Sequence, residues 1–245
     1  MEVKMFPDIK PFGDSALLAN WESVIDEDVH REVLRFARFV EDRFSEEILE
    51  TVPAYSSVAI YCASPSMRDP LLSRILDTWI GHKEIVSPDG SFLVEVPVCY
   101  DEEFALDIRR VADFHGISED TVIALHSQPV YKVYFTGFLP GFPYLGGLDE
   151  RLHTPRLETP RPRVAMGAVG IGGQQTGVYT QASPGGWNII GRSPLHFFTP
   201  EKTPHTIVKA GDFLRFIPVD RDEFDNTLAL VENGIYQLNL KEYVD

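Results

Sequence analysis

The sequence predicts an α+β protein of two domains. Over the first ninety residues, apolar positions follow strand and helix periods in turn. After Pro129 no helical period is sustained, and twelve of the eighteen glycines lie between Gly137 and Gly191. Short apolar strands separated by glycine and proline are typical of a β-barrel or sandwich. The turn at residues 87–90 follows the segment of alternating helix and strand patterns and is the best domain boundary. We therefore expect domains at residues 1–88 and 89–245.

The first domain is expected to contain two helices and four strands. Residues 26–44 carry an apolar stripe at three- and four-residue spacing, with Asp26 as the N-cap. Residues 66–80 form the second predicted helix, with these residues facing inward: Leu71, Leu72, Ile75, Leu76 and Trp79. The predicted strands are residues 15–21, 47–52, 57–63 and 83–86. The order β-α-β-β-α-β predicts a small ferredoxin-like layer.

The second domain is expected to open with a strand at residues 92–99. A helix should then run from Asp101, its N-cap, to Phe114, with Gly116 placed to end it. A short helix is expected at residues 121–126. The last strands of the barrel are predicted at residues 206–208, 213–218 and 234–240.

Composition excludes several classes of partner. The net charge is −15, which opposes binding to nucleic acid or to an anionic membrane surface. No apolar run is long enough to span a bilayer, and the N-terminus lacks a secretory signal. Cys62 and Cys99 lie in strand-like runs, which favours buried thiols over a disulfide. We therefore expect a cytoplasmic protein.

The acidic residues are unevenly distributed. Residues 159–200 contain no Asp or Glu but keep Arg161, Arg163 and Arg192. One interpretation is a buried, turn-rich segment that excludes charge. The other is a pocket for an anionic substrate or a phosphate.

Familiar catalytic motifs are absent from the sequence. It contains no G-x-x-x-x-G-K-[ST], G-x-S-x-G, H-E-x-x-H or C-x-x-C. Its seven histidines show no pairing at three- or four-residue spacing, so no metal site is predicted.

Glycine-rich segments carry the candidate site. Residues 135–147 interleave aromatics with glycine and proline, which predicts either barrel-corner packing or a rigid aromatic wall. Residues 172–177 and 182–187 are loops whose amides suit an oxyanion or phosphate. Side chains of Gln175 and Thr176 suit an amide or carboxylate, whereas Ser183 as a nucleophile has no evident base.

The same segments resemble the family of the 5-oxoprolinase B subunit, KipI and allophanate hydrolase subunit 1. The family patterns G-F-x-P-G-F-x-Y-L, G-G-x-Q-T-G and S-P-G-G-W match residues 137–145, 172–177 and 183–187. Shorter patterns match Pro160-Arg161 and residues 190–194, and the likeness covers nearly the whole chain. One departure is at residues 179–181, where the family has proline after tyrosine.

The resemblance implies a cyclophilin-like β-barrel for the second domain. It also implies a homologous partner, the C subunit (allophanate hydrolase subunit 2), and a third oxoprolinase subunit. Together they would hydrolyse 5-oxo-L-proline to L-glutamate, with ATP as a co-substrate that this chain need not bind. Two alternatives stay open: a KipI-like inhibitor of a sensor histidine kinase, and a carboxyltransferase-type component of a urea carboxylase/allophanate hydrolase system. One fold can serve each of these roles.

We take two sets of residues as the candidate site. The catalytic candidates, expected to converge, are Gln175, Thr176, Ser183 and Arg192. The substrate-binding candidates are Phe138, Phe142, Tyr144, Arg161, Arg163, Tyr179, Gly185, Gly186 and Trp187.

Overall fold

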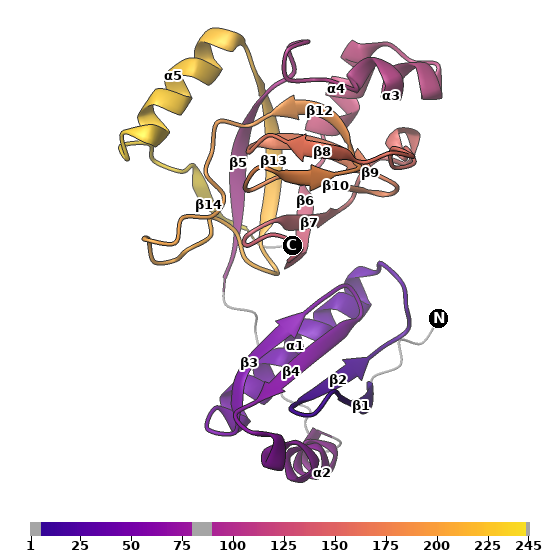
Figure 1. Cartoon of the computed structure of the whole chain (residues 1–245), viewed down its shortest axis with the longest axis vertical. Coiled ribbons are helices and arrows are strands. Elements are labelled where there is room, and N and C mark those ends of the chain that lie inside the picture. The colour runs from indigo at the N-terminus through magenta and orange to yellow at the C-terminus, as the bar shows by residue number, and fades with distance from the viewer. Residues whose placement is uncertain (1–5, 80–89, 244–245) are drawn as a thin grey trace. The chain divides into compact units, whose positions relative to one another are not determined.

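A computed structural model describes residues 6–79 and 90–243 of the chain (Figure 1). The chain divides into two compact units, Met1–Asp89 and Gly90–Asp245. Each unit has a hydrophobic core of its own. The predicted boundary, between residues 88 and 89, lies outside the described residues.

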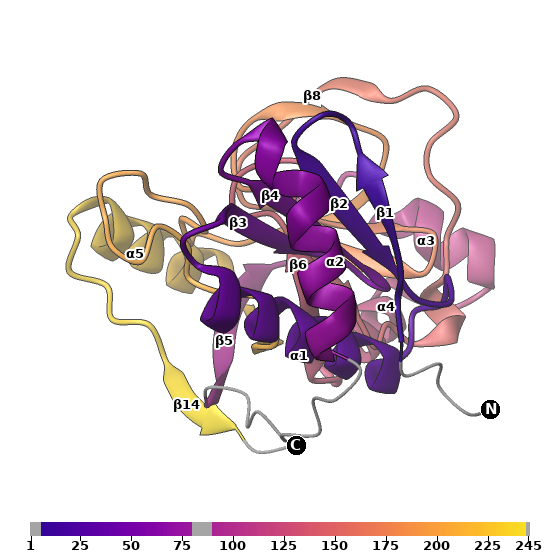
Figure 2. The same cartoon turned by 90° about the horizontal axis from the view of Figure 1, so that it is seen from below.

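The first unit is a four-stranded antiparallel sheet with two helices on one face (Figure 1, Figure 2). The strand order is β1-β2-β4-β3. Leu17 and Ala19 of β2 and Val58 and Ile60 of β4 point to the helices, because alternate residues of a strand face the same side. The elements are β1 (Asp8–Phe12), β2 (Ala16–Asn20), α1 (Glu27–Phe44), β3 (Ile48–Pro53), β4 (Ser57–Cys62), the 3-10 turn η1 (Pro65–Met67) and α2 (Arg68–Trp79).

Helix α1 follows the sequence prediction closely. The Asp26 carboxylate accepts hydrogen bonds from the backbone N–H groups of Asp28 and Val29, so the predicted N-cap is confirmed. In α2 the prediction was wrong for Leu76, which is 42% exposed, whereas Leu71, Ile75 and Trp79 are buried.

The ferredoxin-like arrangement is not confirmed in the form predicted. Strand β4 lies between β2 and β3 and is antiparallel to both, which is the expected split β-α-β unit. The place beside β2 is taken by β1, a strand that we did not predict. The strand predicted at residues 83–86 lies outside the described residues.

The second unit is a closed β-barrel of seven strands with β14 as an additional strand on β5. Its sheet runs β12-β9-β10-β7-β6-β13-β5-β14, and pairing of Arg192 in β12 with Cys99 in β5 closes it. The two-stranded ribbon β8–β11 is a separate sheet. The strands are β5 (Ser91–Cys99), β6 (Tyr131–Thr136), β7 (Pro143–Gly146), β8 (Arg161–Val164), β9 (Ala168–Gly172), β10 (Gln175–Val178), β11 (Ser183–Gly185), β12 (Asn188–Arg192), β13 (Phe213–Val219) and β14 (Leu240–Tyr243).

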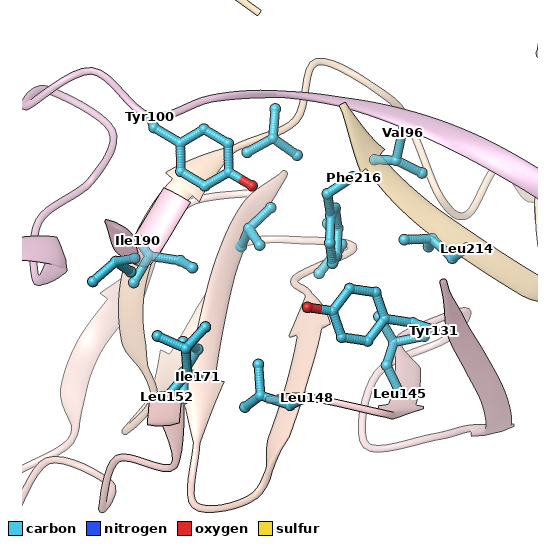
Figure 3. Packing of buried hydrophobic residues seen from close by; sticks show 14 of the residues in the cluster. Val96, Tyr100, Tyr131, Leu145, Leu148, Leu152, Ile171, Ile190, Leu214 and Phe216 are labelled. Carbon is cyan, nitrogen blue, oxygen red and sulfur yellow. The ribbon is translucent and has the colours of Figure 1, made fainter. Parts of the chain in front are cut away.

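The barrel interior is filled by side chains rather than open. Val96, Leu145, Ile171 and Leu214 project into it from four different strands, and each is 0% exposed (Figure 3). Two tyrosines, Tyr100 and Tyr131, turn their hydroxyl groups into this apolar interior (Figure 3). Their hydroxyls therefore need buried hydrogen-bond partners.

Four helical segments accompany the barrel: α3 (Ile108–His115), α4 (Glu119–Ser127), the 3-10 turn η2 (Glu150–Leu152) and α5 (Arg221–Glu232). Helices α3 and α4 pack Val111, Val122 and Leu125 against the core (Figure 1). Cys99, Phe104 and Phe224 form a smaller cluster beneath α5. Both cysteines, Cys62 and Cys99, are buried free thiols, as predicted.

Two sequence predictions near the barrel were wrong. The helix predicted from Asp101 starts only at Ile108, because Asp107 exchanges hydrogen bonds with Ile189 of β12 through its backbone N–H and its carboxylate. Gly116 ends this helix in the left-handed conformation, as predicted. Residues 206–208 were predicted as a strand but form only an isolated bridge, Phe198 with Thr206.

Helix α5 was missed altogether. It begins with a complete capping box in which Asp220 accepts from the Glu223 backbone and Glu223 accepts from the Asp220 backbone. Residues 234–240 were predicted as a strand, but the N–H groups of Ile235 and Tyr236 bond the Leu230 carbonyl and finish the helix. The strand β14 consequently starts at Leu240.

Candidate functional site

The glycines of the β9–β10 hairpin admit aromatic rings to the outer face of the barrel. A side-chain carbon on Gly172 would lie 2.5 Å from the Trp187 indole nitrogen. One on Gly177 would lie 3.1 Å from the Phe142 ring and 2.7 Å from the Pro143 carbonyl oxygen. These glycines are strand residues whose missing side chains make room for rings. They do not form the loop of exposed amides that we expected for an oxyanion or phosphate.

Five aromatic rings gather on this face, and we call them the aromatic floor: Phe138, Phe142, Tyr144, Tyr179 and Trp187. Phe142 is the centre, with ring centroids 5.0 Å from Tyr144 and 5.4 Å from both Tyr179 and Trp187. Most of these contacts are edge-to-face, which is favourable for aromatic pairs. All five were predicted as substrate-binding residues, and the structure brings them together.

Gln175 lies on the same face as the aromatic floor. It stands directly opposite Gly172 in the β9–β10 ladder, so the two residues share a face. Directly opposed β-carbons in a ladder are about 5 Å apart. Because the Trp187 indole occupies the space above Gly172, the indole and the Gln175 side chain lie on the same face of this strand pair.

Arg156 supplies positive charge to this face. Its guanidinium carbon lies 5.8 Å from the centre of the Trp187 ring, within the range of a cation–π contact. Within the described residues no carboxylate pairs with Arg156. Burial raises the pKa of the Tyr144 and Tyr179 hydroxyls, and the charge of Arg156 opposes the rise in both. We call the aromatic floor together with Gln175 and Arg156 the outer site.

Thr176 faces the opposite way, into the barrel. Its Oγ1 lies 2.9 Å from His126 Nε2 and donates to the Gly170 carbonyl at 3.0 Å. His126 Nδ1 lies 2.9 Å from the Tyr100 hydroxyl, and the Tyr131 hydroxyl donates to the His126 carbonyl at 2.7 Å. These bonds give both buried tyrosine hydroxyls a partner, and we call them the interior chain.

The interior chain is sealed from solvent. His126 and Thr176 are both 0% exposed, and the imidazole stacks on Phe216 with ring centroids 4.5 Å apart. Burial lowers the pKa of His126 from 6.5 to about 3. A neutral imidazole with both nitrogens hydrogen-bonded is a core element, so the geometry gives Thr176 a structural role.

Arg192 lies at the far end of β9 from Gln175. In the ladders Gln175 pairs with Gly172, whereas Arg192 pairs with Ala168. Four residues of strand separate the two positions, or about 13 Å. Arg192 donates to the Met166 carbonyl at 3.0 Å and lies 5.5 Å from the Phe104 ring. The expected convergence of Gln175, Thr176 and Arg192 is therefore wrong.

The remaining candidates belong to the ribbon β8–β11. Ser183 is 9% exposed and its hydroxyl donates to the Pro184 carbonyl at 3.2 Å. Arg161 donates to the Asp107 carboxylate at 2.7 Å, so its charge is already paired. Arg163 is exposed. These three residues lie on the ribbon and are not part of the outer site.

Gly185 and Gly186 connect the ribbon to the aromatic floor. A side-chain carbon on Gly185 would lie 2.3 Å from the Tyr179 hydroxyl. The Gly186 carbonyl accepts from the Leu157 N–H at 2.7 Å, and this bond ties the loop that carries Arg156 to the ribbon. Both glycines therefore position neighbours of the outer site.

Two site features escaped the sequence predictions. Arg156 was not among the predicted site residues, although it is the arginine that reaches the aromatic floor. His126 gave no signal, because a lone histidine at the end of a short helix has no distinctive spacing.

The outer site has the chemistry of a binding site. Phe142, Tyr179 and Trp187 are 1%, 2% and 5% exposed, so most of the aromatic floor is packing between side chains, as barrel corners require. The groups that solvent reaches are Phe138, part of Tyr144, Gln175 and Arg156. An amide can both donate and accept, and a guanidinium binds a carboxylate. None of its assigned residues is a serine, cysteine, histidine or carboxylate. Across residues 6–79 and 90–243, no three His, Cys, Asp or Glu side chains cluster as metal ligands. No helix in the same residues is long and apolar enough to cross a membrane.

Comparison with known proteins gives one consistent family. A family model described as the carboxyltransferase domain, subdomain C and D, matches residues 7–208. The chain is 34% identical over 226 residues to the B subunit of 5-oxoprolinase from Bacillus subtilis, covering 88% of this chain and 94% of the relative.

Solved structures agree with the fold. A conserved uncharacterized protein from Pyrococcus horikoshii is 44% identical, with a TM-score of 0.53 over 89% of this chain and 100% of that one. The urea carboxylase of Kluyveromyces lactis has a TM-score of 0.80 over 99% of this chain at 20% identity. The match covers 24% of the urea carboxylase chain, and at that identity it supports the fold alone.

Proposed function

The chain belongs to the family of the carboxyltransferase domain, subdomain C and D, and of the 5-oxoprolinase B subunits, and on that premise we propose that it is the B subunit of an ATP-dependent 5-oxoprolinase. The complex would hydrolyse 5-oxo-L-proline to L-glutamate. It would include the homologous C subunit and a third subunit, with ATP as the co-substrate. We assign no ATP contact to this chain.

One structural observation supports the proposed substrate. Gln175, Trp187 and Arg156 lie together on the outer face of the barrel. 5-Oxoproline is a small five-membered lactam that bears a carboxylate. The ring would lie against Tyr144, the half-buried ring of the aromatic floor, its lactam amide would meet Gln175, and its carboxylate would meet Arg156.

The outer site would bind and orient the lactam without attacking it. Opening an unstrained amide needs an activated carbonyl and a nucleophile, and the assigned residues supply neither. The reacting groups would then come from another subunit of the complex.

A kinetic experiment on the reconstituted complex tests the proposal. Gln175→Ala should lower kcat/KM for 5-oxoproline at least tenfold, which corresponds to about 1.4 kcal/mol of lost binding energy. Arg156→Ala should raise KM for 5-oxoproline by a similar factor, because the carboxylate loses its cation. The matched control is Gln174→Ala at the exposed tip of the same hairpin, which should leave kcat/KM unchanged. Full activity of both site variants would remove the outer site from the reaction.

A second function, a carboxyltransferase-type component that acts on urea, draws support from the family model, whose description names a carboxyltransferase domain. Urea is flat and has amide groups but no carboxylate. A urea-directed outer site would need Gln175 and not Arg156. Arg156→Ala thus separates the two, since it should impair turnover of 5-oxoproline and spare turnover of urea.

A further inference from the structure

Asn188 of β12 is a fully buried polar side chain. It is 0% exposed, and the next two residues of the strand, Ile189 and Ile190, are buried and apolar. Burial of an amide is costly unless its donors and its acceptor are hydrogen-bonded. Asn188 makes three such bonds, and two of them reach elements outside its own sheet.

The bonds of Asn188 join a strand, a helix and a loop. Its Nδ2 donates to the Ile171 carbonyl of β9 at 3.0 Å and to the Pro155 carbonyl at 3.0 Å. Its Oδ1 accepts from Arg110 Nε of α3 at 2.9 Å. Because the bond with Arg110 orients the amide, both Nδ2 protons are directed at the two carbonyls. An apolar side chain could fill the same space but could not bond Pro155.

The bond to the Pro155 carbonyl matters because Arg156 is the next residue. Arg156 is exposed and lies in a segment without helix or strand, so regular backbone pairing does not fix its position. On its other side, the Leu157 N–H donates to the Gly186 carbonyl at 2.7 Å. Asn188 and Gly186 thus hold the backbone on both sides of Arg156.

The same segment is tied to the hairpin that carries Gln175. Gly173, in the turn of that hairpin, donates to the Thr154 carbonyl at 2.8 Å, and the two residues form an isolated bridge. Thr154 is 0% exposed. In the sequence, Gly173 lies two residues before Gln175, and Thr154 lies two residues before Arg156. Short stretches of backbone therefore connect the two polar groups of the outer site.

We propose that Asn188 is a positioning residue that holds Arg156, through the Pro155 carbonyl, at a fixed place relative to Gln175. The inference rests on the proposed function for the role of Arg156, which is to bind the substrate carboxylate. Asn188 does not touch the substrate, because it is 0% exposed. A cation whose backbone is fixed before binding loses less freedom when the carboxylate arrives, so loss of the bond should weaken binding more than it slows the chemical step.

Kinetics of the reconstituted complex test this role. Asn188→Ala should raise KM for 5-oxoproline at least about threefold and change kcat by less than about twofold. Arg110→Ala removes only the bond that orients the amide, at an exposed residue, and should raise KM by a smaller factor. The matched control is Tyr131→Phe, which also removes a bond from a buried side chain to a backbone carbonyl and should leave KM unchanged.

A double-mutant cycle separates positioning from a general loss of stability. If Asn188 acts through Arg156, then Arg156→Ala should raise KM, and addition of Asn188→Ala should change that KM by less than about twofold. Effects on KM that multiply would overturn the inference, since Asn188 would then act independently of Arg156. A wild-type KM in Asn188→Ala, beside a raised KM in Arg156→Ala, would also overturn it and leave the proposed function standing.

Amide hydrogen exchange of the full chain provides a readout that does not require turnover. The N–H groups of Leu157 and Gly173 should exchange at least about tenfold faster in Asn188→Ala than in the wild type, and no faster in Tyr131→Phe. Unchanged exchange at both amides in Asn188→Ala would refute the inference. If both amides exchange faster but Arg156→Ala leaves KM unchanged, Asn188 does hold the loop, and the proposed substrate site fails.

Discussion

Thr176→Val tests whether the hydroxyl of Thr176 acts in the core or in the reaction. Thr176 Oγ1 donates to the Gly170 carbonyl, so it accepts from His126 Nε2–H, and His126 Nδ1 accepts from the Tyr100 hydroxyl. Valine has nearly the same shape as threonine but removes this acceptor. The Nε2–H group would stay buried without a partner, because His126 is 0% exposed.

The expected loss balances the two hydrogen bonds that Thr176 Oγ1 no longer makes, with His126 and with Gly170, against a gain from burial. A buried donor without an acceptor costs about 1–3 kcal/mol. The methyl group that replaces the hydroxyl returns up to about 0.8 kcal/mol through burial in the apolar interior. We therefore expect Thr176→Val to lower the free energy of unfolding of the second unit by about 1–2 kcal/mol. Thr176→Ser keeps the hydroxyl and serves as the control.

Calorimetry and kinetics together distinguish a core role of Thr176 from a catalytic role. The calorimetric transition of the second unit should move down by about 2–4 °C per kcal/mol in Thr176→Val. Turnover per folded complex should stay within about threefold of wild type, which is less than 1 kcal/mol in transition-state energy. A Thr176→Val chain with unchanged stability and a large loss of kcat, rescued in Thr176→Ser, would refute the core role and restore Thr176 as a catalytic residue.

Two other predictions concern the same barrel. Because burial holds the folded-state pKa of His126 at about 3 against an ordinary value of 6.5, only the unfolded chain takes up the proton between these values. The stability associated with the neutral imidazole is thus complete above pH 6.5 and declines as the pH falls toward 3, by about 1.4 kcal/mol per pH unit. Urea midpoints at pH 7.5 and 5.0 should show this decline in the wild type and a shallower one in His126→Gln; equal declines would contradict it. Separately, Gly172→Ala should displace the Trp187 indole, lower stability by about 1–3 kcal/mol and weaken ligand binding. Gly173→Ala, where a side-chain carbon meets nothing within 4 Å but φ is +67°, should cost only about 1 kcal/mol in urea unfolding and leave binding intact.

The elements that the sequence predicted well are those that local patterns determine. The apolar stripe and the Asp26 cap define α1, and Gly116 ends α3, because each signal lies within a few residues of its effect. Helix α5 carried such a signal too, the capping box of Asp220 and Glu223, and we overlooked it. The late start of α3 had no local signal, since it follows from the bonds between Asp107 and Ile189.

The glycine and aromatic motifs identified the family and most of the outer site from the sequence alone. The motifs name which residues matter, but only the tertiary structure decides on which face of the barrel each side chain lies. Gln175 and Thr176 are neighbours in the chain, yet strand alternation turns one to the outer site and the other to His126. Strand register places Arg192 at the far end of β9. The arginine that contacts Trp187 is instead Arg156, which lies in a loop. The face and the position of each side chain depend on pairings between residues far apart in the chain, and a local sequence pattern does not predict those pairings.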